Sequence, residues 1–463
     1  MKRLLPVVLL MTFAWGQAQE TQIIHHMNWV PQSLRSNPAQ LPDYKFFIGL
    51  PAISSVYVGV DMGVSFRDIV QELPNDTFLI DPGFILSNLE NENLIGVTAD
   101  LDLLSFGFRI KRAYLTMSLA ERNRFRFAYP KSLLEFLWKG NGAFIGEPVD
   151  LSALAVEASA YGEAAVGMSL PIGNHWIVAG RFKFLSGLGH AHIQPSAFEL
   201  YTDPESYAIR IRSGLDLYTA GAEIDISKEL DFNFEVDPEL FMFRNPGFSF
   251  DAAATFMPTD RWRLSAGIFD MGSIRWEAEA KRHYVKEGEY TFSGLEIGDV
   301  FKADSVDFTA QLDKIVDTLK IIFDLQSEKA SYSRALQPLI FASAEYQFTR
   351  NTRLGALMRG EYFADRFYPI FNFALHQRLG RVLSLSGSYT IRNRSYYDIG
   401  AGLTMKLGPM QLYILGDNIL NVIWPEQMRS FSLHMGMNLV FGKPMDRKEK
   451  LMKMMEEEPS ETL

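Results

Sequence analysis

The residue types that most often carry chemistry are sparse in this chain. Its 463 residues include eight histidines and no cysteine. The lack of cysteine excludes a disulfide scaffold, a thiolate metal site and a thiol nucleophile. His25 and His26 are the only adjacent histidines, and side chains next to each other in a helix do not share a face, so this pair does not predict a metal site. Gly-x-Ser-x-Gly, P-loop and His-Glu-x-x-His motifs are absent, so we expect no enzyme and no cofactor.

Charged residues on alternate positions of apolar stretches are more informative. If these stretches are strands of a closed barrel, the charged side chains point into its lumen, because neighbours along a strand face opposite sides. The lumen of a membrane barrel is polar, so such charges either fill it or line the path of a permeating solute. The candidate lumen-lining residues are Arg181, Lys183, Glu345, Arg353, Arg359 and Glu361.

The overall composition excludes several classes of protein. Hydrophobic residues make up 47% of the chain and charged residues 22%, which excludes a disordered chain. Lys and Arg number 45 against 55 Asp and Glu, a net charge of -10, which argues against nucleic acid as a partner.

The first residues predict export. A basic start at Met1–Arg3, an apolar stretch to Trp15 and the small residues Gly16 and Ala18 are typical of a signal peptide over residues 1–18. No later run of about 18 apolar residues predicts a membrane helix. The exported chain is therefore either a soluble β-protein or a β-barrel of the cell outer membrane.

Alternation of apolar and polar residues predicts strands along most of the chain. Residues 431–441 place apolar side chains at every odd position and small or polar ones at most even positions, over the length that a tilted membrane strand needs. The same alternation recurs at 340–348, 383–392 and 397–406. A soluble sandwich alternates too, so the pattern alone does not decide between the two classes.

The connections between strands favour the membrane barrel. Tight turns at residues 111–113, 171–175, 258–261, 350–352, 379–381 and 408–409 interleave with long connections at 64–100, 122–152, 187–247 and 271–337. Short turns on one side and long loops on the other are typical of outer-membrane barrels. Trp176, Trp262, Phe348 and Phe441 then lie beside the tight turns and predict a periplasmic aromatic girdle.

We therefore expect an all-β protein, an antiparallel transmembrane β-barrel over residues 46–441. The expected number of strands is fourteen. Sixteen is the alternative, because residues 187–247 could add a pair of strands. The fourteen expected strands begin near residues 46, 101, 113, 153, 175, 248, 261, 338, 353, 367, 382, 396, 409 and 429.

Four segments lie outside the expected strands. Residues 19–45 contain three prolines and predict an irregular arm that either plugs the lumen or hangs below it. External helices are expected at 66–73, 132–138 and 312–323, the last with an apolar stripe at helical spacing. Residues 442–463 form a charged periplasmic tail, and Pro51 could open a lateral gap in the first strand.

Short motifs spread along the chain resemble those of a known group. They are Pro31-Gln32-Ser33, Asn37-Pro38-Ala39, Tyr129-Pro130, Gly140-Asn141, the segment Asp270–Trp276 and the final Phe441. With them the chain resembles an uncharacterised family of Bacteroidetes outer-membrane barrels, a domain of unknown function related to FadL-like and PorV-like proteins. The resemblance implies a fourteen-stranded barrel in which Asn37, Pro38 and Ala39 belong to an N-terminal hatch.

Two functions follow as hypotheses, both in contact with outer-membrane lipid. The first is FadL-like transport of a hydrophobic or amphipathic small molecule, which predicts a continuous apolar pocket of about 300 Å³ or more above the hatch. A lumen packed with charged side chains would count against it. The second is a non-transporting binding module that docks a secreted or surface protein, as PorV-like accessories of type IX secretion do, and it predicts an exposed apolar patch on the outer loops.

Overall fold

The computed structural model describes residues 22–73, 77–79, 81–221, 244–284, 289–292, 326–364, 366–392, 395–419 and 424–442. The predicted signal peptide, the helix at 312–323 and the tail from residue 443 onward lie outside the described residues. None of the described helices is long and apolar enough to cross a membrane.

The described strands form a closed antiparallel β-barrel with fourteen strands in its wall, as the sequence predicts. β1 (Phe46–Gly49) and β2 (Val56–Asp61) together form the first wall strand. Both pair with the last strand, β23 (Ser430–Phe441), and this pairing closes the ring. The other wall strands are β5 (Glu92–Ile110), β6 (Ala113–Pro130), β8 (Ala155–Ile172), β9 (Trp176–Thr202), β11 (Pro246–Phe256), β12 (Trp262–Trp276), β17 (Leu339–Gln347), β18 (Thr352–Phe363), β19 (Arg366–Leu379), β20 (Leu383–Arg392), β21 (Ser395–Leu407) and β22 (Met410–Gly416).

The observed strands begin within two residues of the predicted positions, with one exception. β5 begins at Glu92 rather than near 101, and its first residues pair with the end of β6. Ile95, Val97 and Ala99 alternate there with Gly96, Thr98 and Asp100, so the period-two pattern continues into the stretch that the prediction assigns to a long connection.

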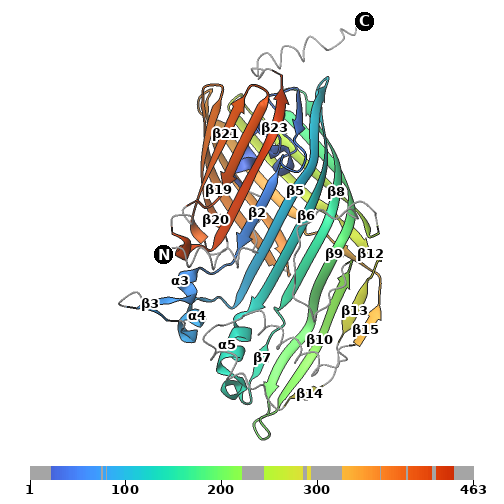
Figure 1. Cartoon of the computed structure of the whole chain (residues 1–463), viewed down its shortest axis with the longest axis vertical. Helices are drawn as coiled ribbons and strands as arrows, with labels where there is room; N and C mark the ends of the chain where they lie inside the picture. Colours follow the sequence, from blue (N-terminus) through green and yellow to red (C-terminus); the bar gives the residue numbers. More distant parts are fainter. Residues whose placement is uncertain are drawn as a thin grey trace, which may run out of the picture.

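Tight turns gather at one end of the barrel and long connections at the other, and we name these the tight-turn end and the long-loop end (Figure 1). At the long-loop end the wall is taller on one side. The first half of β9 pairs with β11, and its second half pairs with β10 (Ile209–Ala220). β10 also pairs with β13 (Lys281–Tyr284) and β14 (Glu289–Phe292), and β13 with β15 (Gln326–Lys329). β10 thus extends the wall and does not enter the ring, so the sixteen-strand alternative is wrong.

The external helices partly match expectation. The predicted helix at 132–138 is α5 (Lys131–Lys139). The one predicted at 66–73 is shorter: α3 (Phe66–Ile69) begins in a capping box of Ser65 and Asp68 and ends where Val70 becomes extended. Residues Gln71–Leu73 then form strand β3, which pairs with β4 (Thr77–Leu79). A further helix, α4 (Pro82–Asn88), was not expected; Asp81 caps it and Pro82 opens it.

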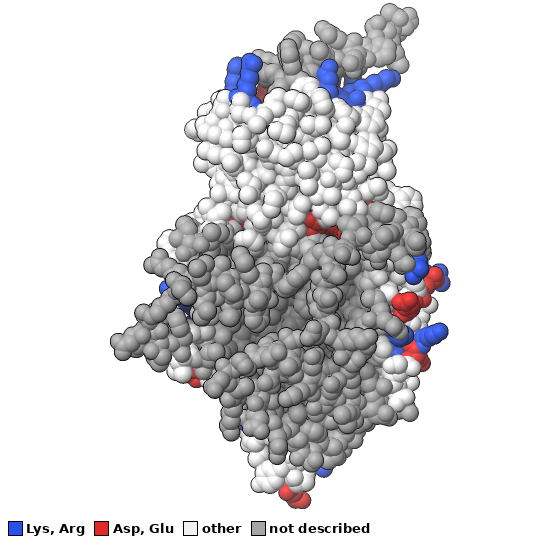
Figure 2. All heavy atoms as spheres, viewed as in Figure 1, with Lys and Arg blue, Asp and Glu red and all other residues white. Residues whose placement is uncertain are grey.

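The outer surface of the wall carries an apolar belt. Figure 2 shows Lys and Arg side chains at the tight-turn end, and next to them a broad band of surface without charged side chains. In β20, Leu385 and Tyr389 face outward while Ser386 and Ser388 are buried, as the alternation predicts. The outward-facing apolar residues of the wall include Val166, Phe182, Phe184, Leu264, Phe373, Leu375, Ile399, Leu403, Ile414 and Met435.

A bulge interrupts the first wall strand at residues 50–55, around the predicted site of a gap at Pro51. Gly49 pairs with Asn438 and Val56 with Met435, so the bulge inserts extra residues on this strand. Backbone hydrogen bonds join the bulge to both neighbouring strands, from Leu50 to Met437 at 3.2 Å and from Ala52 to Leu103 at 3.2 Å. The wall is therefore bridged at this bulge.

Candidate functional site

Residues 22–45, which we call the lumen segment, lie inside the barrel near the tight-turn end (Figure 1). The segment contains the 3-10 helix η1 (Gln22–His26) and the short helix α2 (Ser33–Ser36). Side chains of η1 and the turn after it pack against β22 in one apolar cluster. Its members are Ile23, Ile24, Met27, Trp29, Val30, Tyr413 and Leu415.

Polar contacts tie the first half of the lumen segment to the second half of the ring. The carboxylate of Asp417 accepts the backbone N–H of Gln22 at 3.0 Å. His26 Nδ1 lies 3.1 Å from Oε1 of Glu345, and Arg353 donates to the backbone oxygen of His26 at 2.9 Å. The predicted lumen residues Glu345 and Arg353 are thus buried in the lumen, where they hold this segment.

Close approach of the wall backbone makes these contacts possible. A Cβ atom built on Gly355 of β18 would lie 2.6 Å from the imidazole ring of His26. The neighbouring His25 is fully buried, with Nδ1 3.0 Å from Oγ of Ser36 and Nε2 3.0 Å from Oγ of Ser343. Both histidines therefore contact β17, at Ser343 and Glu345, and their rings meet edge to face with centroids 4.9 Å apart.

Further contacts fix the lumen segment at the tight-turn end. Gln32 and Asn438 exchange two side-chain hydrogen bonds of 2.9 Å. Arg378 pairs with Asp43 at 2.9 Å and lies 4.8 Å above the ring of Trp29. These contacts join a short N-terminal stretch to strands that are hundreds of residues later in the chain.

The predicted hatch residues lie in the middle of this segment. The side-chain oxygen of Asn37 accepts the backbone N–H of Ala39 at 3.1 Å, which closes a local turn. The carbonyl of Pro38 accepts the hydroxyl of Ser169 at 2.6 Å, and Ala39 packs against Phe341 in a buried apolar cluster.

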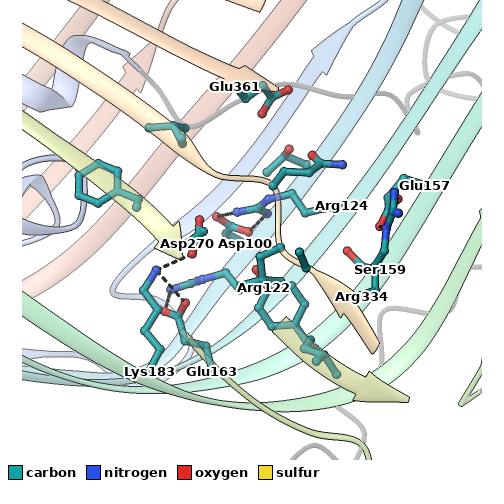
Figure 3. A pocket seen from close by; sticks show the side chains of 18 of the residues that line it. Asp100, Arg122, Arg124, Glu157, Ser159, Glu163, Lys183, Asp270, Arg334 and Glu361 are labelled. Carbon is teal, nitrogen blue, oxygen red and sulfur yellow. Dashed lines mark hydrogen bonds and ion pairs between the residues drawn. The ribbon is translucent and has the colours of Figure 1, made fainter. Parts of the chain in front are cut away.

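A charged cavity of about 110 Å³ adjoins the lumen segment on the side of the long-loop end (Figure 3). Arg35 of the lumen segment borders it, and the other lining residues come mainly from β5, β6, β8, β9, β12 and β18. Arg181, Lys183, Arg359 and Glu361, which the sequence predicts as lumen residues, line this cavity; Glu345 and Arg353 do not. Apolar groups are the minority of the lining, among them Phe269, Ile274, Trp276, Leu336 and Leu339.

Ion pairs connect the cavity walls. Asp100 of β5 pairs with Arg35 at 3.0 Å and also with Arg124 of β6. Asp102 bridges Arg35 at 3.1 Å and Arg122 at 3.0 Å. The lumen segment is thus part of the charged network of the cavity.

The network continues around the ring (Figure 3). Glu163 of β8 accepts from Arg122 at 3.0 Å and lies 3.8 Å from Nζ of Lys183. Lys183 reaches Asp251 at 2.8 Å and Asp270 at 2.6 Å. Arg181 pairs with Asp251 at 2.8 Å and also donates to the backbone oxygen of Arg35. Because each buried carboxylate has a cationic partner, the desolvation cost of the charges is offset.

The outer rim of the cavity combines aromatic rings with one ion pair. Arg334 donates three hydrogen bonds to Glu157, the shortest of 2.7 Å. His190 lies between Glu157 and the hydroxyl of Tyr332, at 3.1 and 2.9 Å, and stacks on Trp276 at 4.7 Å.

Sequence reasoning missed much of this site. The arginines Arg122, Arg124 and Arg126 were assigned to a long loop, whereas β6 continues through them to Pro130. Their spacing, with Phe125 and Phe127 at alternating positions, is a period-two signal that could have identified them. His190 and His192 show the same spacing at the rim.

The predicted girdle residues lie on the outer surface beside the tight turns. The exposed fractions are 47% for Trp176, 42% for Trp262, 62% for Phe348 and 41% for Phe441. Trp176 packs on Phe256 and Trp262 on Tyr346, with ring centroids 4.7 and 4.9 Å apart. These rings cluster where the apolar belt meets the charged tight-turn end.

The chain is similar to several solved structures and to one protein family. A FadL homologue of Pseudomonas aeruginosa is 12% identical, with a TM-score of 0.43, covering 93% of this chain and 98% of that one. The toluene transporter TbuX of Ralstonia pickettii is 8% identical, also with a TM-score of 0.43, covering 89% and 94%. No curated protein matches the chain. Residues 38–417 match the family described as "Family of unknown function (DUF5723)". That match spans most of the chain, which belongs to the DUF5723 family.

Proposed function

We propose that this protein is an outer-membrane barrel that passes a small molecule along its lumen, with the lumen segment as a hatch. The observation that carries the proposal is a cavity bordered by a buried N-terminal segment, which is held by side-chain contacts rather than by strand pairing. The apolar belt supports a place in a membrane. In this orientation the tight turns face the periplasm and the taller wall of β9 and β10 faces outward.

The character of the cavity limits the solute. The hydrophobic form of the hypothesis predicts a large apolar pocket, but the cavity near the lumen segment is charged and has a volume of about 110 Å³. Burying an uncharged apolar molecule among ion pairs gains little, because the charges must stay paired or hydrated. We therefore favour a solute with a polar part over a wholly hydrophobic one.

The route follows from the same contacts. The bulge at residues 50–55 is bridged by hydrogen bonds, so we assign the path to the lumen rather than to the wall. A solute in the cavity meets Arg35 and the rest of the lumen segment before it reaches the tight-turn end. Passage then requires that the segment move.

A covalent lock tests the hatch. Because the chain has no cysteine, the double variant Gln32→Cys with Asn438→Cys carries only two thiols, on side chains that contact each other across the segment and β23. A short bifunctional thiosulfonate reagent should join them and abolish solute flux into reconstituted vesicles. Reduction of the linker should restore the flux.

The single-cysteine variants, treated in the same way, serve as controls and should keep their flux. Equal flux with and without the linker would show that the segment is no hatch. Absence of flux of any small test solute through the unlinked protein would overturn the transport proposal itself.

Docking of a secreted or surface protein is the second candidate. The observation that favours it is the wall of β9 and β10, which extends past the other wall strands at the long-loop end (Figure 1). A stoichiometric protein partner that co-purifies from native outer membranes would support it. Co-purified lipid or solute alone would favour the first candidate.

A further inference from the structure

The charge on the cavity surface is unbalanced. Five carboxylates line the described cavity: Asp100, Glu157, Glu163, Asp270 and Glu361. Eight cationic side chains line it: Arg35, Arg122, Arg124, Arg126, Arg181, Lys183, Arg334 and Arg359. The whole chain, by contrast, has a net charge of -10. A cationic cavity inside an acidic protein concentrates anions, because the surrounding low dielectric focuses its potential.

Two further carboxylates support the cations from behind. Asp102 and Asp251 are almost fully buried, and neither lines the cavity. Asp102 contacts Arg35 and Arg122, and Asp251 contacts Arg181 and Lys183. With these two the cluster holds seven carboxylates against eight cations, so one positive charge is left over. The two carboxylates stand behind the cations, so it is the cationic groups that face the cavity.

A buried hydroxyl also lacks a partner at the cavity wall. Thr98 of β5 lines the cavity and is 1% exposed, and its hydroxyl makes no hydrogen bond within the described part of the chain. A buried hydroxyl without a partner is destabilising, and a ligand oxygen in the cavity would supply the missing hydrogen bond. Thr98 and Asp100 project to the same side of the strand, so the hydroxyl lies beside the arginine network.

The size of the cavity restricts the ligand. A buried water needs roughly 10–15 Å³ of such space, so this cavity holds on the order of seven to ten water-sized groups. An orthophosphate ion or a four-carbon dicarboxylate fits this space.

We propose that this cavity binds a small solute with two negative charges, a phosphate or a short dicarboxylate. The proposal rests on the proposed function and names its substrate class. Arg124 is the most direct ligand to test, because Asp100 keeps its pair with Arg35 when Arg124 is changed. Thr98→Val removes only the hydroxyl and keeps the shape of the side chain.

Calorimetry on the purified full-length barrel in nonionic detergent tests binding without any passage. The probes are inorganic phosphate and succinate, with glycerol as the neutral control, all at constant ionic strength. We expect phosphate or succinate to bind, glycerol not to bind, and the tighter of the two anions to identify the chemistry. Arg124→Gln should weaken binding by about tenfold or more, since a charge-assisted hydrogen bond is worth about 1.5–3 kcal/mol. Thr98→Val should weaken it less.

Arg275→Gln is the matched control, because the Arg275 side chain is 69% exposed and pairs with the exposed Glu277. Equal affinity of Arg124→Gln, Arg275→Gln and the unchanged protein would overturn the proposal, as would equal binding of glycerol. Binding of neither anion to the folded protein would overturn it too. A barrel that binds phosphate or succinate but shows no flux in vesicles would overturn the transport function and leave this site standing.

Discussion

Buried ion pairs dominate the lumen at the level of single residues. Glu163 is an example, because its carboxylate serves both Arg122 and Lys183 and its side chain is 5% exposed. Such a pair adds little net stability when it is intact, since both ions lose their hydration. Removing one member is costly, because the other charge stays buried.

We expect Glu163→Gln to lower the free energy of unfolding by about 3–5 kcal/mol, because it leaves two buried cations with fewer partners. Denaturant unfolding of the detergent-solubilised protein measures the change. The exposed pair of Arg275 and Glu277 supplies the control, and Glu277→Gln should cost about 0–1 kcal/mol. Equal effects of the two variants would mean that the lumen carboxylate is hydrated or replaceable.

His25 makes the docking of the lumen segment sensitive to pH. Burial, together with the neighbouring His26, holds the pKa of His25 well below its ordinary value of 6.5; Glu345 opposes this shift and Arg359 adds to it. The neutral imidazole is therefore the docked form. Its stabilising contribution is complete above pH 6.5 and is lost as the pH falls toward the lowered pKa.

Hydrogen exchange of the amides of η1 should therefore be slow at pH 7.5 and, after correction for intrinsic exchange, less protected at pH 5. His25→Gln, which cannot take up the proton, should remove most of this difference. Protection that stays constant from pH 7.5 to pH 5 in the unchanged protein would contradict the role given to His25.

Single elements show where sequence patterns carry structural information. β20 and β23 were predictable because the apolar belt forces their side chains to alternate. The outer parts of β5 and β6 alternate as well, but they fall within stretches that were predicted as long connections. The short α3 was overpredicted, because its capping box marks a beginning and the pattern gives no end. The charged residues of the lumen were predictable from the alternation of inward and outward side chains along each strand, but their ion-pair partners were not.

The fit of η1 against β18 depends on one backbone position. Gly355→Ala places a Cβ 2.6 Å from the buried ring of His26, so we expect the lumen segment to be displaced while the ring of strands stays closed. Vesicle flux should rise several-fold, and the barrel should keep its resistance to unfolding in SDS at room temperature. Gly387→Ala on β20 is the control, because a Cβ there meets no atom within 4 Å. An unchanged flux in Gly355→Ala would show that the segment tolerates the contact.

For the whole molecule, the barrel follows from local patterns and the site does not. Each strand repeats the same alternation, so the closed ring could be predicted from one sequence. The contacts of the site join residues far apart, such as His26 with Glu345 and Gln32 with Asn438, which are 319 and 406 positions apart. No pattern within a sequence window encodes such pairs, and the volume of a cavity depends on all of them together.

The apolar belt gives a prediction for the molecule in its membrane. Leu403→Arg puts a charge on the outer face of β21. We expect this variant to fold into lipid less favourably than the unchanged protein, by about 2–4 kcal/mol. Leu407→Arg, next to the tight turn after β21, should cost about 0–1 kcal/mol, because a charge near the interface stays hydrated. Urea titration of folding into lipid vesicles compares the two. Equal costs would show that this surface does not face the centre of a bilayer.

The anchoring of the lumen segment to the last strands sets an order for biogenesis. Its binding partners Asp417 and Asn438 are synthesised at the opposite end of the chain, so they reach their positions only when β22 and β23 join the wall. The earliest part of the described polypeptide must therefore wait unfolded until the ring is complete. Docking of the lumen segment is then the final step of barrel assembly, and it can occur only when every strand has been inserted in register.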